Sequence, residues 1–371
     1  MAGQQDPTPV PGAEAYTRRD SDARLSQAAI VLSLGAAAAG VPERVDRPTD
    51  IGLPADLSPL GRPEPVPLAE AVAPLGITVE EQRDRQGPAV AANTRAALMD
   101  LLVSDPNPVV AATLVEACMR SDDRLVRTAA AVAAIDTTGP RNDVLAQLVD
   151  GASRGRGITQ DIGRIGLSRL DPRHPVLRRV VGRPSPLDGS DRPSHTAFLT
   201  HGTFAALTTW WQPGGDFYTY LDGLAPPLHL HDPSFKWSGL YSDGARRLAA
   251  QQMLDWVTAQ GLQQPDLFTH SHGGTVANLA TGLGLQLSRL VLLSWPVHAE
   301  WFPNFNRVQR IIDIRVHLDL VILADRGDQT FTPPPSAAGK VTSHVNGWFQ
   351  HSDTHNPDYW NRYGLAATLG P

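Results

Sequence analysis

The feature that most constrains the fold is a change of hydrophobic periodicity at the segment GRPSPLDGSDRPS, residues 182–194. Before it, from about 67 to 182, apolar residues recur at the three- and four-residue spacing of amphipathic helices. After it, from 195 to 371, short apolar runs alternate with helical patterns, which is typical of a largely parallel sheet covered by helices on both faces. We therefore predict a helical region at 67–182 and an α/β domain at 195–371.

The helical region contains short helical patterns separated by capping and turn residues. The run DDRLVRTAAAVAAI, residues 122–135, is the clearest of them. Short helices at a nearly regular interval resemble HEAT-type repeats, whose helix pairs bury their apolar faces only by stacking. An irregular helical bundle is the alternative. A repeat array would provide a docking surface for a protein partner and no chemistry of its own.

Residues 1–66 are rich in Pro, Gly, Asp and Arg and show little periodicity, so we expect an extended or poorly ordered segment. The start of the chain lacks the charged-then-apolar pattern of a signal peptide. The apolar run at 28–41 is shorter than the roughly 20 residues that span a bilayer. We expect a soluble, cytoplasmic protein without a membrane span.

Composition argues against several kinds of function. The net charge is −6 and no block of Lys and Arg stands out, so the chain has no general attraction to nucleic acid or to an anionic membrane. Cys118 is the single cysteine, which excludes an intrachain disulfide and a cysteine zinc cluster. We predict neither a cofactor nor a metal.

The run DLFTHSHGGTVANLA, residues 266–280, carries the clearest functional pattern. An apolar strand is followed by Ser271, and Gly273 and Gly274 then open a helix. A serine on a sharp strand-to-helix turn, with a small residue two positions later, is the pattern of a nucleophile elbow. The position two residues before the serine holds Thr269, where the usual pattern has glycine.

A second pattern lies upstream of the serine. The sequence FLTHGTFA places His201, Gly202 and Thr203 directly after a short strand that begins near Ala197. Together the two patterns resemble serine hydrolases of the α/β-hydrolase superfamily, of lipase or esterase type. The resemblance covers about the last 175 residues and is carried by THGTF, FKWSGLYSDGARRLAAQQMLDWV, THSHGGTVANLA and HSDTHNPDYW. This superfamily contains many activities, so the fold does not name the substrate.

The resemblance implies an oxyanion hole and a catalytic acid. The backbone N–H groups of Thr203 and His272 would form the oxyanion hole. The acid of the family lies in the turn after the next-to-last strand, which selects Asp319 at the end of IIDIRVHL. Asp325 and Asp328 are the alternatives if LVILA is the strand instead.

The resemblance also implies a histidine base just past the last strand. His351 follows VNGWFQ at that place, and His355, at the entrance of the next helix, is the alternative. His344 falls inside the strand and is a weaker candidate. In such a triad His351 takes the proton of Ser271, and the acid holds the imidazole in the required tautomer.

A zinc site is the competing interpretation of the same segment. The residues at 269–272 read Thr-His-Ser-His and resemble the start of the zinc motif T-H-x-H-x-D-H of metallo-β-lactamase-like hydrolases, and His229 and His231 add two imidazoles. The positions for the motif's Asp and last His hold Gly274 and Thr275. Two ligands are therefore missing from a site that needs three or four.

The sequence therefore predicts a serine hydrolase that cleaves an ester, with lipid-like esters among the candidate substrates, through an acyl-enzyme. The alternative is an inactive hydrolase-like scaffold that binds a partner through its helical region; a zinc-dependent hydrolase ranks below both. Aromatic residues such as Trp210 and Trp237 either line a substrate pocket or pack in the core. Arg246 is expected on a solvated helix face.

Overall fold

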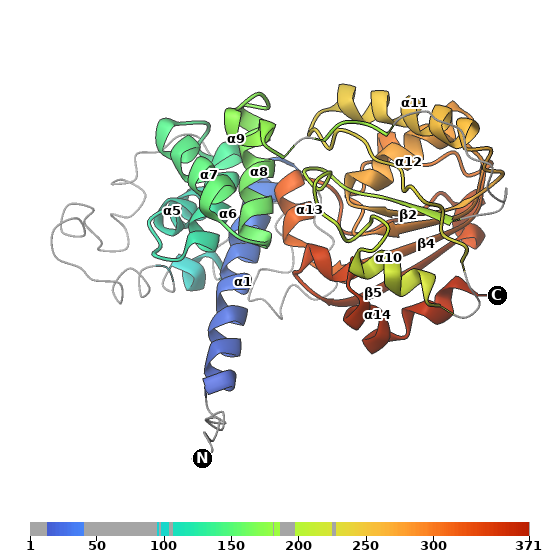
Figure 1. Ribbon diagram of the computed structural model, residues 1–371. Coiled ribbons are helices and arrows are strands. Elements are labelled where there is room, and N and C mark those ends of the chain that lie inside the picture. The colour runs from blue at the N-terminus through green and yellow to red at the C-terminus, as the bar shows by residue number, and fades with distance from the viewer. Residues whose placement is uncertain are drawn as a thin grey trace, which may run out of the picture.

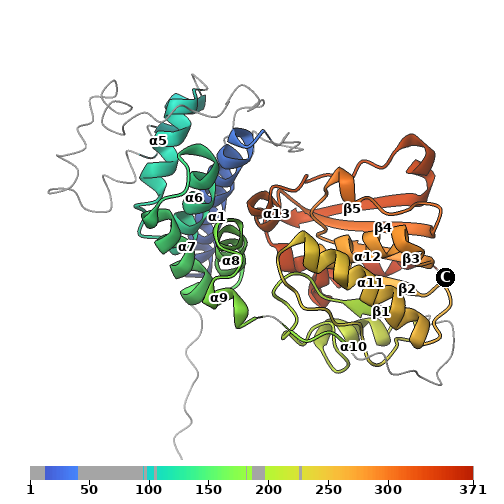
Figure 2. The ribbon, with the colours of Figure 1, turned by 90° about the horizontal axis from the view of Figure 1, so that it is seen from above.

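A computed structural model gives the positions of residues 13–40, 95, 98–103, 107–180, 182–185, 197–224 and 228–370. A helical region and a domain with a sheet lie side by side in Figure 1, and Figure 2 shows the same separation from above. The chain thus combines a helical region with an α/β domain, as the change of periodicity predicts. Over the described ranges, no helix combines the length and apolarity needed to cross a membrane.

The helical region owes its helix starts to local sequence. Asn107 caps α5: its side-chain oxygen accepts a hydrogen bond of 2.8 Å from the N–H of Val109, and Pro108 occupies the first helical position. Asp123 caps α6 in the same way, at 3.1 Å from the N–H of Val126. The labelled helices of this region are α1 Ala13–Ala38, α5 Pro108–Cys118, α6 Arg124–Thr137, α7 Asn142–Arg154, α8 Ile158–Leu170 and α9 Pro175–Arg178.

Helix α6 is the centre of the helical region. Its residues from 129 to 134 are fully buried, and α1, α5, α7 and α8 all pack against it. Helices α1 and α6 approach each other closely because the residues at their contact are small. A Cβ added at Gly35 of α1 would lie 2.7 Å from the Cα of Ala133 on α6. Repeat units in an array contact only their sequence neighbours, so a central helix with contacts on several sides favours the bundle interpretation.

Helix α1 departs from the prediction for residues 1–66. Residues 13–38 are helical, so the expectation of an extended or poorly ordered segment is wrong for them. The run AAIVLSLGAAAA combines helix formers with large apolar residues on all sides, the pattern of a buried helix, and Ala28 to Leu34 are indeed buried. Residues 1–12 and 41–66 lie outside the described part of the chain.

The α/β domain contains a five-stranded, all-parallel sheet in the order β1-β2-β3-β4-β5. Strands β1 to β4 match apolar runs of the sequence, whereas β5 is more polar and partly exposed. Both faces of β1 and β2 are buried, which explains the adjacent apolar residues Phe198–Leu199 and Leu267–Phe268. Because all strands run the same way, the loops after them meet along one edge of the sheet. The strands are β1 Ala197–Thr200, β2 Asp266–His270, β3 Leu287–Leu293, β4 Val308–His317 and β5 Val341–Trp348.

Helices cover both faces of the sheet. On one face α11 and α12 pack together over an apolar cluster that includes Trp256 and Leu290. On the other face α10 and α14 lie over a cluster that includes Phe268 and Trp360. The helices of this domain are α10 Asp216–Asp222, α11 Asp243–Ala259, α12 His272–Leu283, α13 Leu320–Asp325 and α14 Pro357–Tyr363, with 3₁₀ turns η3 Ala299–Trp301, η4 Pro335–Lys340, η5 His351–His355 and η6 Leu365–Leu369.

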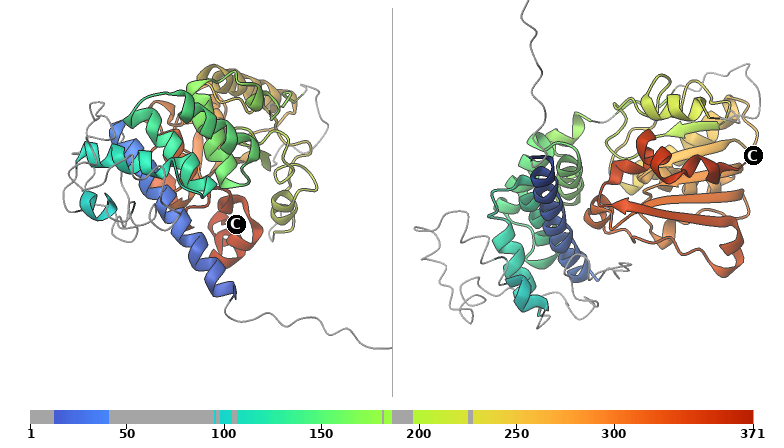
Figure 3. Two further views of the ribbon diagram at one scale, coloured as in Figure 1. Left: turned by 90° about the vertical axis from the view of Figure 1, so that its left-hand side faces the viewer. Right: turned by 90° about the horizontal axis from the view of Figure 1, so that it is seen from below.

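Helix α13 lies at the junction of the two bodies, as Figures 1 and 2 show, and Figure 3 gives two further views of these bodies. It follows β4 in sequence but packs against α1, α6 and α8 of the helical region. The buried side chains of Leu320, Val321 and Leu323 belong to the apolar cluster of the helical region. The segment LVILA is therefore a helix and not a strand, and Asp319 is the residue at which β4 gives way to it.

Candidate active site

Ser271 lies on a strained turn between β2 and α12. Its φ of 53° and ψ of −134° are unusual for a residue with a side chain, and its N–H donates to the carbonyl of Leu293 on β3 at 2.9 Å. Non-glycine residues with positive φ also follow the other strands: Phe204 after β1, Ser294 after β3 and Leu318 after β4. Strained backbone conformations are frequent at functional sites. The edge of the sheet at which these strands end is therefore the candidate location of an active site.

Thr269 is accommodated in the place where the elbow pattern has glycine. Its side chain is fully buried, and its hydroxyl donates to the carbonyl of Val291 on the neighbouring strand at 3.1 Å. The buried hydroxyl thus has a hydrogen-bond partner within the sheet, and the threonine side chain is accommodated between β2 and β3. The departure from glycine therefore leaves the turn at Ser271 intact.

The loop after β1 packs directly against the turn at Ser271. A Cβ added at Gly202 would come within 2.7 Å of the Cβ of Ser271, and one added at Gly273 would come within 2.6 Å of the carbonyl oxygen of His201. Neither position has room for a side chain. The two sequence patterns, separated by about 70 residues, thus meet at one point.

Hydrogen bonds fix the loop from His201 onward. The N–H of Phe204 donates to the carbonyl of Gly239 at 2.9 Å, and the indole N–H of Trp237 donates to the carbonyl of His201 at 2.7 Å. Trp237 is fully buried, so it supports this loop from the core and does not line a pocket. Within the described ranges, the backbone N–H of Thr203 has no hydrogen-bond acceptor, and the same is true of His272.

Asp319 and His351 are in direct contact. The Oδ2 atom of Asp319 lies 2.7 Å from Nδ1 of His351, and both side chains are almost fully buried. The other carboxylate oxygen of Asp319 caps α13 by accepting from the N–H groups of Val321 and Ile322. Asp319 is therefore held rigidly, and an imidazole whose Nδ1–H is bound in this way presents Nε2 as its acceptor nitrogen.

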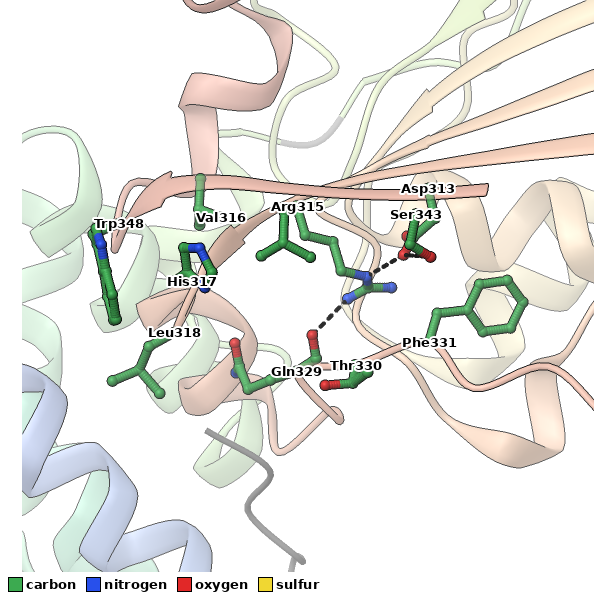
Figure 4. Close-up of a pocket in the computed structure, with 11 residues that line it drawn as sticks. Asp313, Arg315, Val316, His317, Leu318, Gln329, Thr330, Phe331, Ser343 and Trp348 are labelled. Atoms are coloured by element: carbon green, nitrogen blue, oxygen red, sulfur yellow. Dashed lines mark hydrogen bonds and ion pairs between the residues drawn. The ribbon is translucent and has the colours of Figure 1, made fainter. Parts of the chain in front are cut away.

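The main chain of Asp319 is also clamped from the sheet side. The amide of Gln329 accepts from the N–H of Asp319 at 2.7 Å and donates to its carbonyl at 3.2 Å. The backbone carbonyl of Gln329 accepts a hydrogen bond from the guanidinium of Arg315. The same guanidinium forms an ion pair with Asp313 at 2.7 Å. Figure 4 shows Arg315 between these two partners, beside a cavity of about 40 Å³. The sequence gives no sign of this role for Gln329.

The alternative acids and bases have other partners. The carboxylate of Asp325 contacts His272 at 2.8 Å and His298 at 2.9 Å, and Asp328 lies in an isolated bridge with Val297. The ring of His355 stacks on Trp210 with a centroid distance of 4.1 Å. His344, the weaker candidate, is partly buried within β5 as expected.

Asp325 is the centre of a second polar cluster that sequence reasoning missed. Besides the two histidines, it accepts from the hydroxyl of Tyr241 at 2.6 Å. Arg246 lies over the ring of Tyr241 and approaches Nε2 of His272 to 3.1 Å. The expectation that Arg246 faces solvent is wrong, because only 3% of it is exposed. An ion pair of 2.7 Å with Asp243 and the rings of Tyr241 and Trp301, over which the guanidinium lies, make the burial of this cation favourable.

Ser271 and His351 lie in the same corner of the molecule, joined through His270. The ring of His270 is 4.5 Å from that of His351, and its Nε2 lies 3.1 Å from the carbonyl oxygen of His351. In the described chain, no hydrogen bond joins the hydroxyl of Ser271 to an imidazole. Contacts between catalytic groups are often loose before substrate binds and tighten in the complex.

Electrostatics separate His351 from its neighbours. Burial by itself would lower the pKa of His351, but the carboxylates of Asp319, Asp161 and Asp325 outweigh it, and the pKa is raised. Burial lowers the pKa of His355 to about 3, assisted by the charge of His351, and it also lowers the pKa of His270 well below its usual range. Of these imidazoles, only His351 is therefore suited to carry a proton near neutral pH.

The histidines of the Thr-His-Ser-His segment point to different partners. His270 is directed to His351, whereas His272 is directed to Asp325. In the part of the chain that the structure describes, no three His, Cys, Asp or Glu side chains converge as a metal site would require.

Comparisons with known proteins leave the chain without a family assignment: no family model matches it, and no curated protein is similar to it.

Proposed function

We propose that the protein is a serine hydrolase of α/β-hydrolase type that cleaves an ester through an acyl-enzyme. The observation that carries the proposal is the 2.7 Å contact between Asp319 and His351, together with a serine of positive φ at the end of β2 whose neighbour His270 contacts His351. The order of the three residues along the chain supports it, as does the packing of Gly202 against Ser271.

The proposed first half-reaction forms the acyl-enzyme. The Oγ of Ser271 attacks the ester carbonyl carbon while its proton passes to Nε2 of His351, and the Asp319 carboxylate stabilises the resulting imidazolium. The negative charge on the carbonyl oxygen is bound by the N–H groups of Thr203 and His272. Each such donor contributes about 3 kcal/mol to the transition state. The imidazolium then gives its proton to the departing alkoxide, which leaves as the alcohol.

The second half-reaction restores the serine. A water molecule attacks the acyl carbonyl while His351 takes one of its protons, and the same oxyanion donors bind the charge again. The acyl–oxygen bond to Ser271 breaks, and the imidazolium returns its proton to Oγ. The products are a carboxylic acid and the free enzyme, so no cofactor or redox partner is needed.

A fluorophosphonate probe tests the proposal directly. The wild-type chain should be labelled at one site, and Ser271→Ala should not be labelled. Ser294→Ala is the matched control, because Ser294 also has a positive φ, of 47°, and follows the neighbouring strand. Equal labelling of the wild-type chain and Ser271→Ala, or none of either, would contradict the proposal.

The substrate class is tested with p-nitrophenyl esters of graded acyl length. A maximum in kcat/KM at a definite length would measure the acyl pocket, and a steady rise with length would favour lipid-like esters. The Ser271→Ala variant gives the background rate for each ester. Turnover that persists in this variant would mean that the reaction does not use Ser271.

A further inference from the structure

We infer that the helical region is part of the active site, because it holds the loops that carry the catalytic groups in position. The inference rests on the proposed function. It assigns a positioning role to α13 and to the ion pair between Arg326 and Asp136, which joins the two regions.

The apolar packing gives the first support. Leu320, Val321 and Leu323, on the helix that Asp319 caps, are buried in the apolar cluster of the helical region and not in either cluster that covers the sheet. Phe204, which follows the oxyanion donor Thr203, belongs to the same cluster. The loops that carry the acid and an oxyanion donor therefore have their apolar anchors in the neighbouring region.

The loop that carries the base shares this anchor. Trp348 is the last residue of β5 and Phe349 follows it on the way to His351, and both pack against the cluster of the helical region. The main chain of Phe349 has a positive φ of 67° and donates to the carbonyl of His317 at 3.1 Å. A residue holds such a conformation only where surrounding contacts fix it, and here the apolar cluster that α13 shares with the helical region supplies part of them.

A buried ion-pair network locks the far end of α13. The guanidinium of Arg326 donates from two nitrogens to one carboxylate oxygen of Asp136 on α6, at 2.9 Å and 2.5 Å. Arg169 of α8 binds the other oxygen of Asp136 at 2.6 Å, and Arg326 also reaches the carbonyl of Leu32 on α1. Only 9% of the Arg326 side chain is exposed. Helices α6 and α1 thus hold the residue that directly follows α13, and α8 holds its partner Asp136.

The first test compares two equal core truncations. Leu323→Ala removes packing beneath α13, and Leu148→Ala removes the same atoms from α7, which packs on α6 and α8. We expect Leu323→Ala to lower kcat about 10- to 100-fold with little change in KM, because small displacements of catalytic groups have effects of that size. Leu148→Ala should stay within about twofold of the wild-type kcat, although both truncations loosen the helical region. Equal effects of the two on kcat would overturn the inference.

The second test uses Arg326. Arg326→Gln should lower kcat, and Arg326→Lys, which keeps the charge but not the two-nitrogen contact, should recover part of the loss. Arg124→Gln, at an ion pair of 2.9 Å with Asp150 inside the helical region, is the control and should leave kcat unchanged. A second readout is the downfield proton resonance of the Nδ1–H of His351, which should weaken in Arg326→Gln and not in Arg124→Gln. An unchanged resonance and kcat in Arg326→Gln would refute the positioning role.

Failure of the proposed function is distinguishable from failure of this inference. The first abolishes fluorophosphonate labelling of the wild-type chain. The second leaves that labelling in place and leaves kcat unchanged in Leu323→Ala and Arg326→Gln.

Discussion

The two ends of α13 each carry an aspartate bound to histidine, yet the two environments differ in what they allow. At the start of the helix, Asp319 contacts His351 alone and uses its other oxygen to cap the helix. At the end, Asp325 binds His272, His298 and the hydroxyl of Tyr241. The first carboxylate orients one imidazole, whereas the second is saturated by three donors.

The second nitrogen of each imidazole decides what the pair can do. His272 uses Nε2 for Asp325 and places Nδ1 3.2 Å from the hydroxyl of Thr275, so neither nitrogen is left for a substrate. His351 uses Nδ1 for Asp319, and its Nε2 has no partner among the described residues. A contact between histidine and aspartate is therefore not enough to identify a catalytic pair. The free nitrogen is what distinguishes the candidate active site from a structural cluster.

The largest difference between the two ends should appear when the histidines are removed. His351→Ala should lower kcat about 10⁶-fold, as completely as Ser271→Ala, because residues that act as one unit are not additive. His298→Ala should leave kcat within about tenfold of the wild-type value, since the carboxylate of Asp325 that His298 contacts is also contacted by His272. Both are measured with p-nitrophenyl esters after active-site titration. Similar losses in the two variants would remove the distinction.

The aspartates should differ in the kind of damage. Asp319→Asn should lower kcat about 10⁴-fold by leaving the imidazole in the wrong tautomer, while the fold survives because asparagine also caps helices. Asp325→Asn should instead lower the free energy of unfolding by about 3–5 kcal/mol, since it leaves a buried charged network incomplete. Urea unfolding and steady-state kinetics on both variants provide the measurement. A stable but inactive Asp325→Asn would reverse the assignment.

Acid should destabilise the protein through its buried histidines. Burial lowers the pKa of His272 to about 4, although Asp325 opposes the shift, and burial lowers that of His355 to about 3. The unfolded chain binds these protons from about pH 6.5 downward, whereas the folded chain binds them only below about pH 4 at His272 and about pH 3 at His355. The free energy of unfolding therefore falls as the pH is lowered from about 6.5 to about 3. At pH 5 each of the two histidines lowers the free energy of unfolding by about 2 kcal/mol.

Two other histidines act in the opposite direction. The pKa of His351 and that of His298 are raised by their carboxylate partners against the effect of burial, so their contribution is present below pH 6.5 and is lost as the pH rises through their folded values. Urea unfolding at pH 7.5 and pH 5 measures the balance. His355→Phe keeps a ring against Trp210 and should reduce the loss at pH 5. No reduction in this variant would mean that His355 titrates normally.

A smaller effect is expected at His355 itself. His355→Ala removes a stacked ring 4.1 Å from that of Trp210, and such a contact is worth about 1 kcal/mol. The variant should retain activity within about tenfold of the wild type, because the base remains. An inactive, folded His355→Ala would make His355 the base in place of His351.

Chelators should have no effect on turnover. The nitrogens of His270 and His272 face different partners, so a zinc ion would have to break existing contacts to bind both. Dialysis against EDTA followed by a kinetic assay is sufficient. Stoichiometric zinc that is lost together with activity would overturn the serine mechanism.

The sequence by itself determined the elements and the approximate places of the candidate residues. The linker at 182–194 separates two periodicities, and local spacing marks β2, the turn at Ser271 and the loop after β1, because these depend on neighbours a few residues apart. The sequence-based prediction was wrong for α1, because the Pro, Gly, Asp and Arg residues of the segment 1–66 were given more weight than the helix-forming run AAIVLSLGAAAA within it. It also left the choice among Asp319, Asp325 and Asp328 open.

Only the tertiary structure decided which side chains meet. Asp319 and His351 are 32 positions apart, and Asp136 and Arg326 are 190 apart. No local pattern encodes such pairs, because the same carboxylate at the end of a strand can cap a helix, orient an imidazole or join a buried cluster. The burial of α13 in the helical region is a further example. Its apolar residues suit a strand or a helix equally well, and packing against α1, α6 and α8 settles the matter, since burial of apolar area outweighs the weak local preference.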